Sequence, residues 1–181
     1  MTEKRMVGMQ APGFKMDAVM PNKEFGTVSL EENMKNDLWT VLFFYPMDFT
    51  VICPTEITSV SDQFDEFKEL DTEVIGVSTD TIHAHKAWIN TSRDDNGLGG
   101  LNYPLAADTN HRVSRDYGVL IEDEGIALRG LFIISPEGEL MYSAVNHNNI
   151  GRDVDETLRV LQALQTGGLC PANWQPGQET L

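Results

Sequence analysis

Residues 39–56 read WTVLFFYPMDFTVICPTE and contain the signals for a strand, a turn and the start of a helix. The first seven residues are apolar apart from one threonine, are rich in aromatic and β-branched side chains, and end at Pro46. A short run of this kind is typical of a strand that is covered on both faces. Pro54 suits the first turn of a helix, where its missing N–H group costs no hydrogen bond. The stretch therefore predicts a buried strand that leads directly into a helix.

The segments on either side of this stretch carry their own periodic patterns. Apolar residues recur at helical spacing after Cys53, which predicts one helix that continues to Leu70. Residues 7–37 are interrupted by Pro-Gly and Pro-Asn pairs, which favour loops and short strands. Downstream, the patterns predict a strand over 73–78, a helix over 81–91, turns over 94–104, a short helix over 111–117, a hairpin of strands over 130–135 and 140–145, and a helix over 153–164.

This order of elements predicts an α/β protein with a central mixed β-sheet flanked by helices. A central βαβ unit followed by an antiparallel hairpin and a final helix favours a thioredoxin-like fold. No linker divides the chain, so residues 1–181 are expected to form a single domain. Gly167 and Gly168 end the last helix, which leaves a mobile C-terminal tail, about residues 166–181, that carries Cys170.

Composition limits the partners and the compartment. The net charge is −15, so the surface is expected to repel nucleic-acid phosphates and anionic lipids. No apolar run approaches the roughly 20 residues that span a bilayer. The N-terminal residues, Met1 to Gly8, lack an apolar block of signal-peptide length, which predicts a cytoplasmic protein with no membrane partner.

Cys53 stands at the predicted start of a helix, just beyond the carboxyl end of a strand. The unpaired N–H groups and the positive end of the helix dipole at this position favour a thiolate, which is the nucleophilic form. Thr50 could direct its hydroxyl at the sulfur or at a bound oxygen, and Pro46 could shield the sulfur from water. From position alone, a structural cysteine buried under the first turn of the helix is an equal alternative.

The motif Pro46-x-x-x-Thr50-x-x-Cys53 resembles the peroxiredoxins, specifically the typical two-cysteine group that includes bacterial alkyl hydroperoxide reductase peroxidase subunits. The likeness covers nearly the whole chain. Its other matching stretches are VSTD (77–80), HKAW (85–88), YGVL (117–120), RGLFII (129–134), GRDVDETLR (151–159) and CPANW (170–174). The resemblance implies a thioredoxin-like fold and an enzyme that reduces hydrogen peroxide and organic hydroperoxides.

The resemblance also implies roles for individual residues near Cys53. Cys53 would attack the peroxide and become a sulfenic acid, Thr50 would hydrogen-bond the peroxide, and Pro46 would limit solvent access. Arg129 would favour the thiolate and steady charge on the leaving oxygen. A supporting pair, Glu56 and Arg152, would hold the surroundings of Arg129.

By the same resemblance, Cys170 is the resolving cysteine, which forms an intersubunit disulfide with Cys53 of a partner chain. An external dithiol, thioredoxin-like or a flavoprotein disulfide reductase, would then reduce the disulfide. A homodimer that assembles into a ring of five dimers is also implied. No cofactor or metal is expected, and His83 and His85, two residues apart, are interpreted as surface or interface histidines.

Two other readings stay open on the sequence. One is a non-catalytic role, either as a holdase chaperone or as a relay that passes oxidation to a partner protein. The other is a one-cysteine peroxidase in which Cys170 is idle. The motifs do not separate these from the two-cysteine mechanism.

Overall fold

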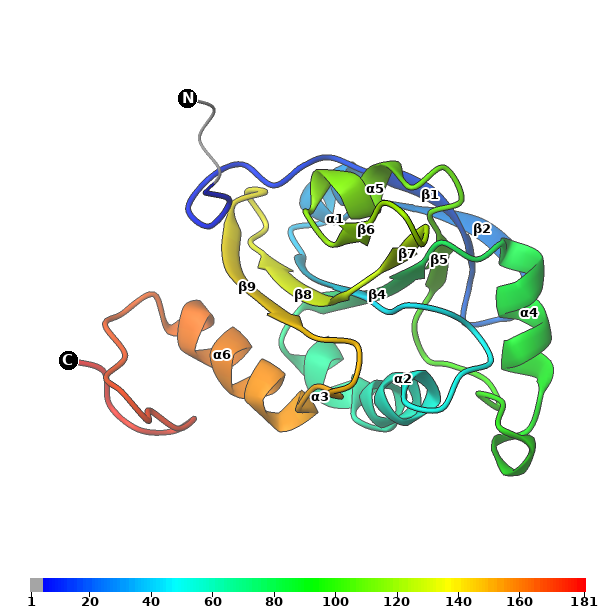
Figure 1. Cartoon of the computed structure of the whole chain (residues 1–181). Coiled ribbons are helices and arrows are strands. Elements are labelled where there is room, and N and C mark those ends of the chain that lie inside the picture. The colour runs from blue at the N-terminus through cyan, green and yellow to red at the C-terminus, as the bar shows by residue number, and fades with distance from the viewer. Residues whose placement is uncertain (1–4) are drawn as a thin grey trace.

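Figure 1 shows the computed structural model, which describes residues 5–181, as a twisted sheet with helices on both faces. The first four residues of the N-terminal segment considered above lie outside this range. The main sheet contains β1 (Lys15–Val19), β2 (Phe25–Ser29), β3 (Trp39–Phe44), β4 (Thr72–Ser78), β5 (Leu105–Ala107), β8 (Arg129–Ile134) and β9 (Leu140–Asn146). A separate ribbon pairs β6 (Leu120–Ile121) with β7 (Ile126–Ala127). The helices are α1 (Leu30–Lys35), α2 (Cys53–Asp62), α3 (Phe64–Glu69), α4 (Ile82–Asn90), α5 (Arg112–Asp116) and α6 (Val154–Thr166), with a 3-10 turn at Arg93–Asp95.

The main sheet is mixed, as predicted. Its strand order is β2-β1-β5-β4-β3-β8-β9. The central strands β3, β4 and β5 run parallel, and the outer pairings, β1 with β2 and β5, and β8 with β3 and β9, are antiparallel. The strand β3 therefore lies inside the sheet, and the chain leaves its carboxyl end toward α2.

The side chains of β3 alternate between two apolar cores. Val41 and Phe43 pack on the face that is covered by α2, α3, α4 and α6, whereas Leu42 and Phe44 pack on the face beneath α1 and α5. Each of these four residues is at most 2% exposed. This arrangement confirms the prediction of a strand covered on both faces and explains why the run is continuously apolar rather than alternating.

The structure differs from the prediction in its short elements. The single helix expected to reach Leu70 is divided at Gln63, whose φ of −106° and ψ of 13° depart from helical values. Both resulting helices place apolar side chains, such as Ile57 and Phe67, in the same core, so the helical spacing continues across the break.

The helix α1 lies in a segment predicted as loops and short strands. The capping signal Ser29-x-x-Glu32 marks its start, and the Ser29 hydroxyl accepts a hydrogen bond from Glu32 N at 3.2 Å.

The tail beyond α6 has no helix or strand but is tied to the rest of the chain. Arg159 Nη1 donates a hydrogen bond to the Trp174 carbonyl at 3.0 Å, and the Trp174 side chain is only 3% exposed. The backbone N–H of Leu181 donates to the carbonyl of Leu169 at 2.8 Å, which closes the tail into a loop. To move as predicted, the tail must therefore release these contacts. Within residues 5–181, none of the helices has the length and apolar character needed to cross a membrane.

Candidate active site

Cys53 occupies the first position of α2, immediately after the loop that leaves β3. Its side chain is fully buried, and Pro46 at the other end of the loop is buried as well. The first turn of α2 closes when the N–H groups of Thr55 and Glu56 donate to the carbonyl of Ile52, at 3.0 and 3.4 Å. The sulfur therefore lies at the positive end of the helix, in a position that favours a thiolate.

Arg129 brings a positive charge to this sulfur. Its Nη1 lies 3.3 Å from Cys53 Sγ, and its Nε donates to the carbonyl of Asn148 at 3.0 Å. The side chain is 3% exposed, so the guanidinium is fixed from two sides and largely removed from water. A guanidinium held in this way favours negative charge on the sulfur and on an oxygen leaving it.

Glu56 links Arg129 to a second arginine. One carboxylate oxygen accepts from Arg129 Nη1 at 2.6 Å, and the other accepts from Arg152 Nε at 2.6 Å and from its backbone N–H at 2.8 Å. Arg152 also donates to the carbonyl of Gly130 at 2.7 Å. Two guanidinium groups share one carboxylate, so this cluster has one surplus positive charge. A thiolate at Cys53 would neutralise it.

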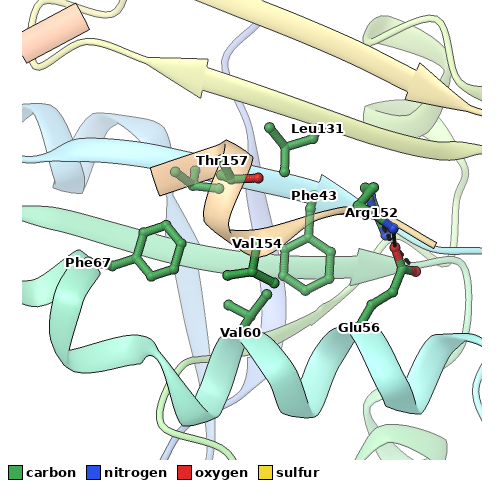
Figure 2. A pocket seen from close by; sticks show the side chains of 9 residues that line it. Phe43, Glu56, Val60, Phe67, Leu131, Arg152, Val154 and Thr157 are labelled. Atoms are coloured by element: carbon green, nitrogen blue, oxygen red, sulfur yellow. Dashed lines mark hydrogen bonds and ion pairs between the residues drawn. The ribbon is translucent and has the colours of Figure 1, made fainter. Parts of the chain in front are cut away.

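Figure 2 shows a small apolar cavity behind the Glu56 carboxylate. Its volume is about 20 Å³, which is room for about one water molecule. The ion pair of Glu56 and Arg152 closes one end, and the cavity is otherwise lined mainly by apolar side chains, including Phe43 and Val154. Hydrocarbon rather than water faces this side of the Glu56 carboxylate. The two arginines therefore provide most of the stabilisation of its negative charge.

Thr50 is half-buried in the loop before Cys53, and its hydroxyl proton is already engaged. Thr50 Oγ1 donates to the carbonyl of Met47 at 2.8 Å, and the Thr50 carbonyl accepts from Asn96 Nδ2 at 3.2 Å. The hydroxyl oxygen keeps its lone pairs for a hydrogen bond from a ligand. Pro46, Thr50 and Cys53 thus lie along the loop that leads into α2, and the Arg129 guanidinium reaches the Cys53 sulfur, whereas the Thr50 hydroxyl proton is directed at the Met47 carbonyl.

Cys170 lies apart from Cys53 within one chain. Its Sγ contacts the Ala163 carbonyl at 3.6 Å and Thr166 Oγ1 at 3.5 Å, on the last turns of α6. In Figure 1 the tail lies beyond the C-terminal end of α6, on the side away from α2. Both cysteines are free thiols.

Comparison with known proteins identifies the family. Residues 7–143 match the model of the AhpC/TSA family, and residues 162–181 match that of the C-terminal domain of 1-Cys peroxiredoxin. The chain belongs to the peroxiredoxin family. This peroxiredoxin is accordingly a thiol-dependent peroxidase, as the sequence predicts.

Similar proteins cover nearly all of the chain. The Bacillus subtilis (strain 168) protein YkuU, which has a provisional peroxiredoxin name, is 79% identical over 98% of this chain and 99% of its own. The chloroplastic 2-Cys peroxiredoxin BAS1 of Spinacia oleracea is 51% identical over 97% of this chain and 67% of its own. The solved structure of reduced Plasmodium vivax 2-Cys peroxiredoxin matches with a TM-score of 0.94 at 38% identity, over 97% of this chain and 92% of that one. The last match confirms the predicted thioredoxin-like fold class.

His85 corrects one prediction from the sequence. It was expected at the surface or at an interface, but its side chain is fully buried within a single chain and contacts Asp48. The helical spacing indicates that His85 is buried, because it lies three residues before the buried Trp88 and therefore on the same face of α4. Within residues 5–181, no three His, Cys, Asp or Glu side chains are grouped as ligands of a metal ion.

Proposed function

We propose that Cys53 is the nucleophile that attacks the peroxide. The observation that supports this most strongly is the position of Arg129, whose guanidinium contacts the sulfur and belongs to a buried cluster with one surplus positive charge. A buried cation without a matching anion is costly, so the cluster is most stable when the sulfur is a thiolate. The start of α2 adds to the same preference.

The chemical step follows from these groups. The Cys53 thiolate attacks one oxygen of the peroxide, the O–O bond breaks, and the sulfur becomes a sulfenic acid. The second oxygen leaves as an alkoxide or hydroxide and takes a proton to give an alcohol or water. Arg129 stabilises the negative charge as it develops on that oxygen, and the free lone pairs of Thr50 Oγ1 accept a hydrogen bond from the peroxide O–H. Pro46 excludes water from one side of the sulfur.

Cys170 of a partner chain then resolves the sulfenic acid. Its thiolate attacks the Cys53 sulfur, the S–O bond breaks as the disulfide forms, and the sulfenic oxygen leaves as hydroxide, which takes a proton to give water. A disulfide requires the two sulfurs to be about 2 Å apart. Because Cys53 has no exposed surface, the first turn of α2 must open for this step, and the tail must leave α6.

The proposed assembly is a homodimer that forms a ring of five dimers, with residues 1–181 as one domain and the tail of residues 166–181 reaching the partner chain. The strand β9 supports a dimer because it ends the sheet and presents Val145, 48% exposed, and the segment after it presents Ile150, 60% exposed. A thioredoxin-like or flavoprotein disulfide reductase would return the disulfide to thiols. Such recycling requires a reducing compartment, which is consistent with the cytoplasm.

Non-reducing electrophoresis tests the disulfide directly. One equivalent of hydrogen peroxide added to the reduced protein should convert it to a covalent dimer, because each Cys53 reacts with Cys170 of its partner. In Cys170→Ser the covalent dimer should be absent while peroxide is still consumed. In Cys53→Ser both the dimer and the consumption of peroxide should be lost.

The alternative outcome distinguishes the one-cysteine mechanism. If wild-type protein stays monomeric on the gel after it has consumed an equivalent of peroxide, Cys170 is idle and the proposed resolution step is wrong. If Cys53→Ser consumes peroxide as fast as wild type, the nucleophile itself has been misassigned.

A further inference from the structure

The connection between α4 and β5 contacts the loop that carries Thr50. In Figure 1 this connection, residues 91–104, lies beside the loop between β3 and α2. The side-chain amide of Asn96 donates to the Thr50 carbonyl, with Asn96 Nδ2 3.2 Å from the oxygen. Among residues 5–181, this hydrogen bond alone joins Thr50 to a distant part of the chain, because the bond from Thr50 Oγ1 to Met47 stays within the loop. The chemistry proposed above gives Asn96 no role.

The backbone of Asn96 is held firmly in place. The buried indole of Trp88 donates from Nε1 to the Asn96 carbonyl at 2.8 Å. The next residue, Gly97, packs so closely on the end of α4 that a Cβ atom there would lie 2.1 Å from the Thr91 carbonyl oxygen, so only glycine fits. The Gly97 N–H donates to the Ser92 carbonyl at 2.8 Å, which closes the turn. The connection is therefore a rigid support for the Asn96 side chain.

Asn96 combines a left-handed backbone with a side chain that can donate a hydrogen bond. Its φ of 62° and ψ of 26° lie in the region that asparagine, aspartate and glycine adopt more readily than most residues. Of these three, only asparagine has an N–H group on its side chain. Glycine or aspartate would suit the backbone, but neither would donate to the Thr50 carbonyl. Asparagine thus meets both requirements of this position.

The other supports of the loop lie before Thr50. The Asp48 N–H donates to Asp80 Oδ2 at 3.0 Å, and the Phe49 ring packs on Trp88 at a centroid distance of 5.7 Å. Val51, which follows Thr50, is 82% exposed. The hydrogen bond from Asn96 therefore fixes the Thr50 peptide at the point where the loop passes from these supports into solvent.

We propose that Asn96 is a positioning residue for the attack on peroxide, which holds the Thr50 peptide so that the lone pairs of Thr50 Oγ1 face the peroxide. This inference rests on the proposed function, in which those lone pairs accept a hydrogen bond from the peroxide O–H. The hydroxyl proton is directed at the Met47 carbonyl, so the backbone and the side-chain torsion of Thr50 set the direction of the lone pairs. The rate of a reaction in a preorganised site falls when a group that contacts the substrate is displaced.

Two substitutions remove the donor and leave the backbone conformation accessible. Asn96→Gly keeps the left-handed conformation without a side chain, and Asn96→Asp keeps the shape but places an acceptor-only carboxylate against the Thr50 carbonyl. Asp37→Gly is the matched control, because Asp37 is also exposed and has a φ of 56°, but it precedes β3 at the end of the strand opposite Cys53. Stopped-flow fluorescence gives the rate constant for the first oxidation by hydrogen peroxide, and urea unfolding gives the midpoint of each variant.

We expect Asn96→Gly to slow the attack on hydrogen peroxide about fivefold, the effect of losing one neutral hydrogen bond. Asn96→Asp should be slowed at least as much, because its carboxylate repels the Thr50 carbonyl oxygen. Asp37→Gly should react at the wild-type rate. The unfolding midpoint of Asn96→Gly should match that of Asp37→Gly, which would show that the slower attack does not come from a general loss of structure.

A double-mutant cycle with Thr50→Val tests whether Asn96 acts through Thr50. Valine keeps the branched shape of threonine but has no hydroxyl oxygen to accept the hydrogen bond from the peroxide. If Asn96 serves to place that oxygen, adding Asn96→Gly to Thr50→Val should slow the attack by less than a further factor of about two. A purely structural contribution of Asn96 would slow both backgrounds by the same factor.

Wild-type rates of attack in both Asn96→Gly and Asn96→Asp would overturn the proposal. A slowing by Asn96→Gly that persists in full in the Thr50→Val background would also overturn it, because Asn96 would then act independently of the hydroxyl. If the midpoint of Asn96→Gly falls below that of Asp37→Gly, the cycle is carried out with Asn96→Asp, which keeps the side chain. A Thr50→Val variant that reacts as fast as wild type would instead contradict the role of Thr50 in the proposed function, and this inference with it.

Discussion

Replacing Arg129 with methionine is expected to slow the attack of Cys53 on peroxide by about 10²- to 10³-fold, the usual effect of removing one donor that stabilises developing charge. Methionine keeps much of the volume but removes the guanidinium that lies 3.3 Å from the Cys53 sulfur. The thiolate then loses its counter-charge, and the leaving oxygen loses its donor. Arg129→Lys keeps the charge but not the planar fork that contacts the sulfur, Glu56 and Asn148, so its rate should lie between the two.

The measurement is the second-order rate constant for the first oxidation, followed by stopped-flow fluorescence in single turnovers. Arg115→Met is the matched control, because Arg115 is a half-exposed arginine that pairs with Glu122 on the surface. Its rate should equal that of wild type. A rate for Arg129→Met within a few-fold of wild type would show that the guanidinium does not assist the reaction.

Replacing Glu56 with glutamine is expected to lower the free energy of unfolding by about 3–5 kcal/mol, the range observed when one partner of a buried ion pair is removed. Glutamine has the same shape, but it leaves Arg129 and Arg152 without the carboxylate that both contact, so at most the Cys53 thiolate offsets their two positive charges. The side chains of Glu56 and Arg129 are 5% and 3% exposed, and the apolar cavity in Figure 2 admits little water to relieve the repulsion.

Urea unfolding followed by circular dichroism measures this effect. Glu122→Gln, which removes an exposed carboxylate that also pairs with an arginine, should leave the unfolding midpoint unchanged. If the midpoint of Glu56→Gln also matched wild type, the stability of the buried cluster would not depend on its carboxylate. That result would contradict the argument from the surplus positive charge of the cluster, which supports a Cys53 thiolate.

The sequence predicted best the features that depend on neighbouring residues. The strand β3, its end shortly before Pro46 and the helix that begins at Cys53 follow from local periodicity and proline chemistry, and all three occur in the structure. The break at Gln63 escaped prediction because both helices face the same core and share one apolar spacing. The strand β5 has only three residues, too few for a pattern to develop.

Contacts between distant residues could not be derived from local patterns. Arg129 and Arg152 meet Glu56 across 73 and 96 positions of sequence, and only the family resemblance indicated them. The spacing of His85 from Trp88 indicates the buried face of α4, but its partner Asp48 lies 37 positions away, so no local pattern indicates their contact. The pairing of Cys53 with Cys170 is proposed between two chains, so neither local patterns nor the geometry of one chain displays it.

The most direct measurement of the central claim is the site and stoichiometry of the first oxidation. Reduced Cys170→Ser protein receives one equivalent of hydrogen peroxide in the presence of a reagent that traps sulfenic acids, and peptide mass spectrometry locates the label. A nucleophilic Cys53 predicts close to one label per chain, on the peptide that contains Cys53, together with complete consumption of the peroxide. Consumption of the peroxide with Cys53 unlabelled and still free to alkylate would contradict the assignment of this buried sulfur as the reactive group.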